Sequence, residues 1–157
     1  QCDTFRPSGT TVPPRLSPAA RAWLERAPVA HLATASRDGW PHVVPITFVW
    51  LDERLYTALD AKPKRVPVAR LRRVRNLLAN PRVAVVVDRY SDDWARLGYV
   101  LLQGYGHLVT EAAAVQRACA ALRAKYPSYR AGPLRLEAAP VIAIEPLRAV
   151  EWGDLAP

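Results

Sequence analysis

The chain has 157 residues, of which 50% are hydrophobic and 23% charged, and its formal net charge is +8. This size and composition are typical of one soluble globular domain. No apolar run approaches the roughly 20 residues that span a bilayer, and no secretory signal is visible, so we expect neither membrane insertion nor secretion. Two cysteines, Cys2 and Cys119, are too few for a disulfide framework, which favours the reducing cytoplasm.

The N-terminal segment divides into an arm and a first helix. Residues 1–15 carry Pro, Gly, Ser and Thr without periodicity, so we expect an N-terminal arm followed by a single domain over residues 16–157. Ser17-Pro18 predicts a helix start, because a hydroxyl N-cap precedes Pro at the first helical position. An apolar face with helical spacing follows, and Pro28 ends this helix.

Three strands are predicted next, over residues 29–36, 41–50 and 55–59. Asp38-Gly39 is a strong short-hairpin signal, and Asp52-Glu53 predicts the second turn. Pro45 lies inside the second strand and indicates a bulge or an edge position, because Pro cannot donate to a ladder.

The middle of the chain predicts a basic helix and two strands. The helix covers about residues 70–80, with Leu71, Val74 and Leu78 on its apolar face and Arg72, Arg73 and Asn76 opposite. Residues 82–88 are almost uniformly β-branched and apolar, so we expect a buried strand, followed by a loop over 89–97. A long strand over 98–110 contains Gly104 and Gly106, which suggest a bend or bulge.

The C-terminal third predicts one helix and one strand. Thr110 can cap a helix that runs to about Lys125, residues 126–139 are irregular, and a last strand begins at 141–144 and leads into 150–152. The predicted fold is therefore mainly β (α+β), with six antiparallel strands in a small barrel and about three helices.

The positive charge is concentrated in one block. Residues 61–87 contain eight cations and no acid, which indicates an anionic partner or a solvated face. The cations are Lys62, Lys64, Arg65, Arg70, Arg72, Arg73, Arg75 and Arg82. Two guanidiniums and an amide near a helix start suit a phosphate.

Other site classes are disfavoured. The block lacks interleaved aromatics for base stacking, so we do not expect nucleic-acid binding. The three histidines, His31, His42 and His107, lack partners at ligand spacing, so we expect no metal site. No nucleophilic triad or dyad is readable, and a cofactor that carries the chemistry needs none.

Three phrases in a fixed order resemble a known family. They are HLATASRDGWPHVVPITFVWLDERLYTAL, RRVRNLLANPRVAVVVD and DDW. The chain is similar in these phrases to the pyridoxamine-phosphate-oxidase-like family, the FMN-binding split barrels, and most of all to a subgroup that depends on the deazaflavin coenzyme F420. The likeness is good over about residues 18–110 and weak in the C-terminal third.

The resemblance implies a homodimer whose site is shared between the two subunits. The ring system would lie against the second predicted strand, the phosphate would be held near the start of the basic helix, and aromatic residues would reach the cofactor or the substrate. The residues that match these positions are Pro45, Ile46, Thr47 and Phe48 for the ring, Arg72, Arg73 and Asn76 for the phosphate, and Trp94 with Trp152 for the aromatics.

The expected function is that of an oxidoreductase that transfers a hydride between coenzyme F420 and a small organic substrate. The oligoglutamate tail of F420 would explain the cations of the preceding loop, Lys62, Lys64 and Arg65, which otherwise serve solubility. Two alternatives stay open: an FMN-dependent oxidase or reductase of the same family, and a non-catalytic carrier of a flavin, a deazaflavin or a haem-like ligand.

Overall fold

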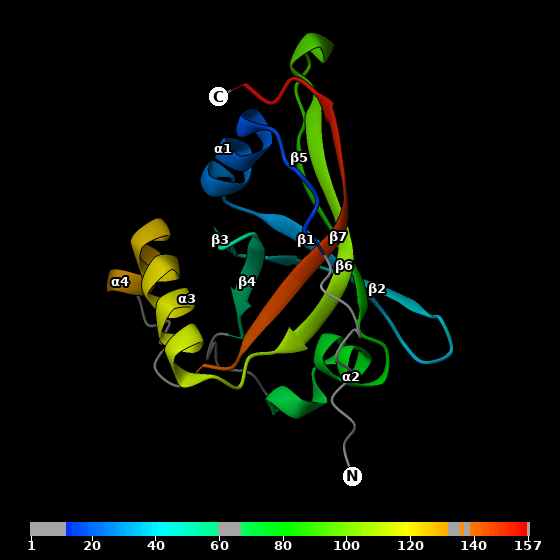
Figure 1. The fold of residues 1–157 in the computed structure, drawn as a ribbon, viewed down its shortest axis with the longest axis vertical. Helices are drawn as coiled ribbons and strands as arrows, with labels where there is room; N and C mark the ends of the chain where they lie inside the picture. Colours follow the sequence, from blue (N-terminus) through cyan, green and yellow to red (C-terminus); the bar gives the residue numbers. More distant parts are fainter. Residues whose placement is uncertain (1–11, 60–66, 132–135, 137–138, 157) are drawn as a thin grey trace.

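A single antiparallel sheet dominates the computed structural model, which describes residues 12–59, 67–131, 136 and 139–156 (Figure 1). Its seven strands have the order β2-β1-β5-β6-β7-β4-β3. Their bounds are β1 Ala30–Ala35, β2 Pro41–Ile46, β3 Val49–Leu51, β4 Arg54–Ala58, β5 Arg82–Arg89, β6 Gly98–Leu108 and β7 Val141–Gly153. The helices are α1 Pro18–Arg26, α2 Arg72–Ala79, α3 Ala112–Lys125 and the short α4 Ser128–Ala131, with 3₁₀ turns η1 Val68–Arg70 and η2 Trp94–Arg96.

Local signals fix the first helix and both early turns. The Ser17 hydroxyl accepts a hydrogen bond from the Ala20 amide at 3.1 Å, which confirms the predicted N-cap of α1. Gly39 has φ +84° in the β1–β2 hairpin. Asp52 and Glu53 have φ of 49° and 59°, so both residues of the β3–β4 turn adopt the left-handed conformation that a two-residue hairpin requires.

The sheet has seven strands where the sequence predicts six, because the expected strand over 41–50 is broken at Thr47 and Phe48. Its first half is β2, at one edge of the sheet, and its second half is β3, at the opposite edge. Since only two residues join the two edges, the sheet must curl until they meet. The split barrel is thus closed by the chain itself, and the prediction of a mainly β, curled antiparallel fold is confirmed in this form.

Two long strands extend the sheet beyond the barrel. Strand β7 runs unbroken from Val141 to Gly153 and pairs with β6 along its length, with a register shift between Gln103 and Gly104. The bend or bulge predicted at the glycines is therefore present as a bulge beside Gly104, with Leu147 of β7 as the extra residue. A Cβ at Gly104 would collide with the Glu145 carbonyl group, so the close approach of β6 and β7 at this point requires glycine.

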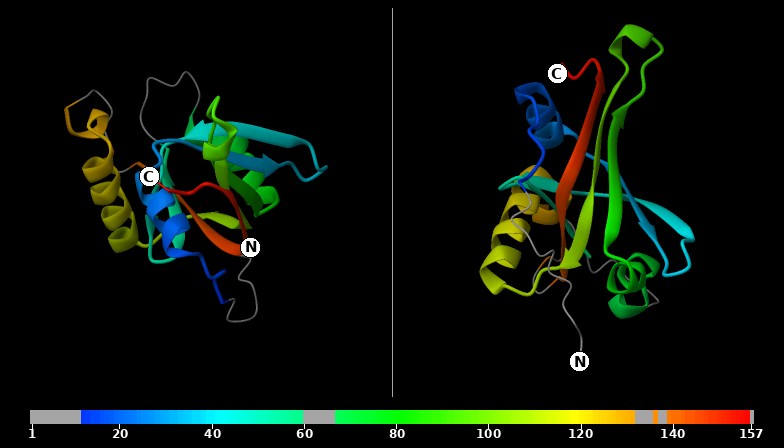
Figure 2. Two further views of the ribbon diagram at one scale, coloured as in Figure 1. Left: turned by 90° about the horizontal axis from the view of Figure 1, so that it is seen from above. Right: turned by 45° about the vertical axis from the view of Figure 1, so that its right-hand side comes forward.

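The core forms on both faces of the sheet. The barrel interior is filled by alternate strand residues and by α1, with Phe48, Leu55 and Ile144 fully buried. On the outer face, α3 and α4 pack over β3, β4 and the start of β7, where Tyr56 and Ala143 belong to a second cluster (Figure 2). Helix α3 begins at Ala112 after Glu111, so the prediction of a Thr110 cap is wrong. None of the described helices has the length and apolarity needed to cross a membrane.

The basic helix faces the sheet differently from its predicted orientation. Leu77 is 5% exposed and Leu78 is 72% exposed, so Leu77 is the core residue. Asn76 is buried as well as Val74, although the sequence predicts it on the face opposite the apolar residues. Packing of α2 against β1 and β6 decides this rotation, which the short apolar pattern of the helix does not specify.

Candidate functional site

The outer face of the sheet continues past α3 and α4 into a region whose side chains remain exposed or half-exposed. Residues paired across an antiparallel ladder point to the same side, so the register defines this region, which we name the bare face. It consists of Pro41, Val43, Pro45, His31, Ala33, Ala35, Ala84, Val86, Asp88, Tyr99, Leu101, Gln103, Arg148, Val150 and Trp152. Val43 is 58% exposed, Val150 46% and Trp152 51%. Exposed apolar side chains gathered on one face of a sheet are typical of an interaction site.

Strand β5 illustrates why the sequence alone misleads here. Its apolar run predicts a buried strand, and Val83, Val85 and Val87 are buried, whereas Ala84 and Val86 are half-exposed on the bare face. The prediction of a buried strand therefore holds for one face of β5 only. An apolar strand that is covered on one side only is expected where a second molecule covers the other.

The segment from Pro45 to Phe48 lies where β2 leaves this face. Pro45 is exposed, and its position in an edge strand agrees with its missing donor. Ile46 is 8% exposed and Phe48 is fully buried, so both belong to the barrel core. Pro45 and the half-buried Thr47 are therefore the members of this segment that a ligand on the outer side could touch.

Three side chains from the end of α3 and from α4 hold the strand break. The hydroxyl groups of Thr47 and Tyr129 lie 2.8 Å apart. The Tyr126 hydroxyl accepts a hydrogen bond from the Phe48 amide at 3.0 Å and lies 2.9 Å from the Phe48 carbonyl oxygen. Lys125 Nζ lies 4.0 Å from the centre of the Phe48 ring. The sequence predicts an irregular segment over 126–139 and a helix that ends near Lys125, and neither pattern indicates this role for Lys125, Tyr126 and Tyr129.

Burial shifts the titration of two of these groups. Desolvation lowers the pKa of Lys125 to about 8, against a smaller opposing effect of Glu25. Lys125 also donates to the Leu24 carbonyl oxygen at 3.2 Å. Burial raises the pKa of Tyr126 above its ordinary value, so this hydroxyl is neutral at physiological pH. The strand break is thus held by one neutral phenol and by a lysine that loses its proton more easily than usual.

The predicted phosphate residues lie on α2 in three different environments. Arg72 is exposed and Arg73 is half-buried. Asn76 is 3% exposed, and its amide nitrogen donates to the Thr34 hydroxyl at 2.9 Å. The structure therefore gives Asn76 a role inside the core and leaves it out of reach of a soluble ligand. The loop cations Lys62, Lys64 and Arg65 lie outside the described residues.

The two predicted aromatics lie on the extension formed by β5, β6 and β7. Trp94 is 78% exposed in η2, and Trp152 stacks on Tyr99 with ring centroids 5.5 Å apart. Arg89 holds this extension together, because it donates to the Arg96 carbonyl oxygen at 3.0 Å and to Asp154 at 3.1 Å. The aromatic side chains are therefore presented on an anchored element.

The structure does not bring all the predicted residues together within one chain. The β5–β6 connection with Trp94 lies at one end of the molecule's long axis, and α2 lies near the other, with the strand break between them (Figures 1 and 2). The bare face extends along the strands between these ends. A site that uses both the aromatics and α2 therefore needs two chains.

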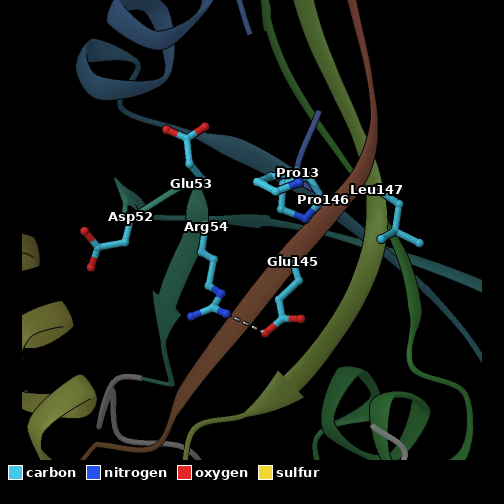
Figure 3. Close-up of a pocket in the computed structure, with 7 residues that line it drawn as sticks. All are labelled: Pro13, Asp52, Glu53, Arg54, Glu145, Pro146 and Leu147. Carbon is cyan, nitrogen blue, oxygen red and sulfur yellow. Dashed lines mark ion pairs between the residues drawn. The ribbon is translucent and has the colours of Figure 1, made fainter. Parts of the chain in front are cut away.

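A surface pocket on the described chain lies elsewhere. It is bordered by the β3–β4 turn and the bulged part of β7, and Arg54 pairs with Glu145 at 3.3 Å inside it (Figure 3). Its lining consists of Pro13, Asp52, Glu53, Arg54, Glu145, Pro146 and Leu147, and none of these is a site residue predicted from the sequence. Asp52 and Glu53 point away from the ion pair. Within the described residues no group of three or more His, Cys, Asp or Glu side chains could hold a metal ion.

Comparisons with known proteins identify relatives of this fold. A family model described as pyridoxamine 5'-phosphate oxidase matches residues 16–153. No curated protein gave a match. A conserved hypothetical protein, Rv2991 from Mycobacterium tuberculosis, is similar in structure with a TM-score of 0.70 and 21% identity over 88% of this chain and 86% of that one. The heme storage protein HutZ from Vibrio cholerae has a TM-score of 0.67 and 17% identity, over 87% of this chain and 94% of that one. An F420 reductase has a TM-score of 0.61 and 24% identity, over 86% of this chain and 98% of that one.

Proposed function

Because the chain belongs to the pyridoxamine 5'-phosphate oxidase family, with the split-barrel fold, we propose that it is a homodimeric oxidoreductase that transfers a hydride between coenzyme F420 and a small organic substrate. Each cofactor would lie between the two protomers. FMN-dependent oxidation or reduction is the nearest alternative, and non-catalytic carriage of a flavin, deazaflavin or haem is the alternative of a different class.

The observation that carries this proposal is the separation of the candidate residues toward opposite ends of the molecule, with the bare face between them. Trp94 and Trp152 belong to one end of the molecule and Arg72 to the other. A two-fold axis through the bare face would place the aromatic extension of one protomer beside the strand break and α2 of its partner. The same packing would cover the apolar side chains that a monomer exposes.

The residues present fit a planar ring system with a phosphate. Pro45 and Thr47 offer an edge-strand surface for the ring, with Thr47 as a hydrogen-bonding group. Arg72 and Arg73 at the start of α2 offer guanidinium groups for the phosphate, and the loop cations Lys62, Lys64 and Arg65 offer charge for an oligoglutamate tail. We leave Asn76 out of this set because its amide is used by Thr34.

When bound, the deazaflavin would supply the hydride-transfer chemistry itself. The protein would bind the phosphate through Arg72 and Arg73, orient one ring face against β2, and exclude water with Trp94 and Trp152 of the partner protomer. No acid or base of the chain is required for these tasks. The two structural relatives are named for different ligands, F420 for the reductase and heme for HutZ. The fold alone therefore does not determine which ligand this chain binds.

The test is a titration of the purified chain with F420, FMN and haem, followed by absorbance, and then an assay of reduced F420 with quinone, enone and tetrapyrrole acceptors. F420 should bind more tightly than FMN, and its reduced form should be consumed at a rate that depends on the acceptor. Tighter binding of FMN favours the first alternative. Tight binding without turnover over the whole acceptor panel favours a carrier.

The basic block separates the cofactors further. Substitution of both Lys62→Ala and Lys64→Ala should weaken F420 more than a tail-less analogue, and the difference should shrink at high salt because exposed charges are screened over about 10 Å at 0.1 M. Arg72→Ala should weaken both ligands by about ten-fold or more, since both keep the phosphate. Arg117→Ala, an exposed cation on α3, is the matched control and should change neither affinity.

A further inference from the structure

We propose that Tyr126 and Tyr129 are positioning residues that fix the break between β2 and β3 and thereby orient Thr47 toward the bound ring. This inference rests on the proposed function, because it assigns the ring to the outer side of β2. It goes beyond that function by giving a task to the α3–α4 segment, which is distant in sequence from every predicted site residue.

The first observation is that, at the break, a side chain supplies the hydrogen-bond partner of the backbone. The Phe48 amide donates to the Tyr126 hydroxyl at 3.0 Å, and the Phe48 carbonyl oxygen lies 2.9 Å from the same hydroxyl. The Pro28 carbonyl oxygen, which follows α1, also lies 2.9 Å from it. A hydroxyl has one proton, so it donates to one carbonyl at a time while it accepts from Phe48. One phenol therefore replaces the ladder partner that Phe48 lacks.

The second observation concerns Thr47. Alternation along the strand places Thr47 on the same side as Val43 and Pro45, at the border between the bare face and the part covered by α3 and α4. Its hydroxyl lies 2.8 Å from the Tyr129 hydroxyl. Tyr129 is 6% exposed, so this partner is fixed by packing. Because a hydroxyl can accept two hydrogen bonds and donate one, Thr47 keeps capacity for a ligand while Tyr129 sets its direction.

The third observation is that the tyrosines are themselves rigidly held. Their rings pack edge to face with centroids 5.9 Å apart. Lys125 Nζ lies over the Phe48 ring at 4.0 Å and over the Tyr126 ring at 5.5 Å, and it donates to the Leu24 carbonyl oxygen. The end of α3 thus contacts both α1 and the strand break, so displacement of either tyrosine would move the ring-binding strand.

The experiment compares Tyr126→Phe, Tyr129→Phe and Thr47→Val, with Arg130→Ala as the control. Arg130 is exposed on α4 and donates to the Ala124 carbonyl oxygen, so its loss perturbs α4 without touching Thr47. In the ligand-free chain, exchange of the Phe48 amide measured by NMR should become about three- to ten-fold faster in Tyr126→Phe and stay unchanged in Arg130→Ala.

In the ligand titrations, Tyr129→Phe and Thr47→Val should each weaken FMN or F420 by about three- to ten-fold and shift the absorption band of the bound ligand. The double variant should bind no more weakly than Thr47→Val alone, because Tyr129 acts on the ligand only through the Thr47 hydroxyl. If the wild-type protein binds a ligand and these variants bind it equally with an unchanged spectrum, the inference is wrong and the proposed function stands. If the wild-type protein binds neither FMN nor F420, the proposed function fails first and the positioning role fails with it.

Discussion

Substitution of Val43 by aspartate should break the proposed dimer. Val43 lies in the middle of β2 on the bare face and is 58% exposed. Full burial of a valine side chain is worth about 1.5 kcal/mol or more, so covering the exposed part contributes about 1 kcal/mol per protomer. The two-fold symmetry doubles this value to about 2 kcal/mol, which corresponds to roughly a 30-fold weaker dimer before the cost of burying a carboxylate is added.

Sedimentation velocity over a range of micromolar concentrations measures this effect. The wild-type chain should be dimeric, and Val43→Asp should be largely monomeric with an unchanged far-UV spectrum. Val12→Asp is the matched control, because Val12 is 79% exposed, precedes α1 and lies outside both the bare face and α2. A monomeric wild-type chain that still binds cofactor, or equal dissociation of the two variants, would refute the shared-site argument.

Three further predictions concern stability. Between pH 8 and 10.5, Lys125 is protonated in the unfolded chain and deprotonated in the folded chain. The free energy of unfolding should therefore rise with pH over this range, by about 1–2 kcal/mol after allowance for partial exposure. Chemical denaturation of Lys125→Met at several pH values should show no such rise. Parallel profiles would contradict the burial of the charge. Gly104→Ala should lower stability by about 3 kcal/mol, seen as a fall of roughly 6–12 °C in Tm, because its Cβ meets the Glu145 carbonyl group. Asn76→Leu and Thr34→Val should each cost about 1–3 kcal/mol, and their double variant should cost less than the sum in urea denaturation; strict additivity would show that the two side chains are not coupled.

Local signals in the sequence predict most elements correctly. The Ser17-Pro18 start of α1, the Asp38-Gly39 hairpin and the glycine bend in β6 depend on neighbours within a few residues, and all three are present. The break at Thr47 and Phe48 could not be predicted in this way. Those residues continue an apolar strand pattern, and the partners that interrupt it are about 80 residues later in the chain.

The candidate site was predictable to a smaller extent. The rotation of α2, which buries Leu77 and Asn76 and exposes Leu78, depends on contacts with β1 and β6 that a helical pattern of eight residues does not specify. The role of Tyr126 and Tyr129 could not be predicted from periodicity, because their segment has none. Two tyrosines three residues apart directly after a helix were nevertheless a usable signal, since buried phenols need hydrogen-bond partners.

The strand break also limits how copies of this chain can associate. The edge strands of a sheet expose unpaired amide and carbonyl groups, which can form hydrogen bonds with a strand of another chain. Here one edge strand, β2, contains Pro41 and Pro45, which cannot donate, and the other, β3, is only three residues long. Both edges are therefore poor templates for edge-to-edge strand pairing between copies of the chain. The homodimer proposed above would instead pair the bare faces of two copies, and such a two-fold contact closes at two because each copy has one bare face.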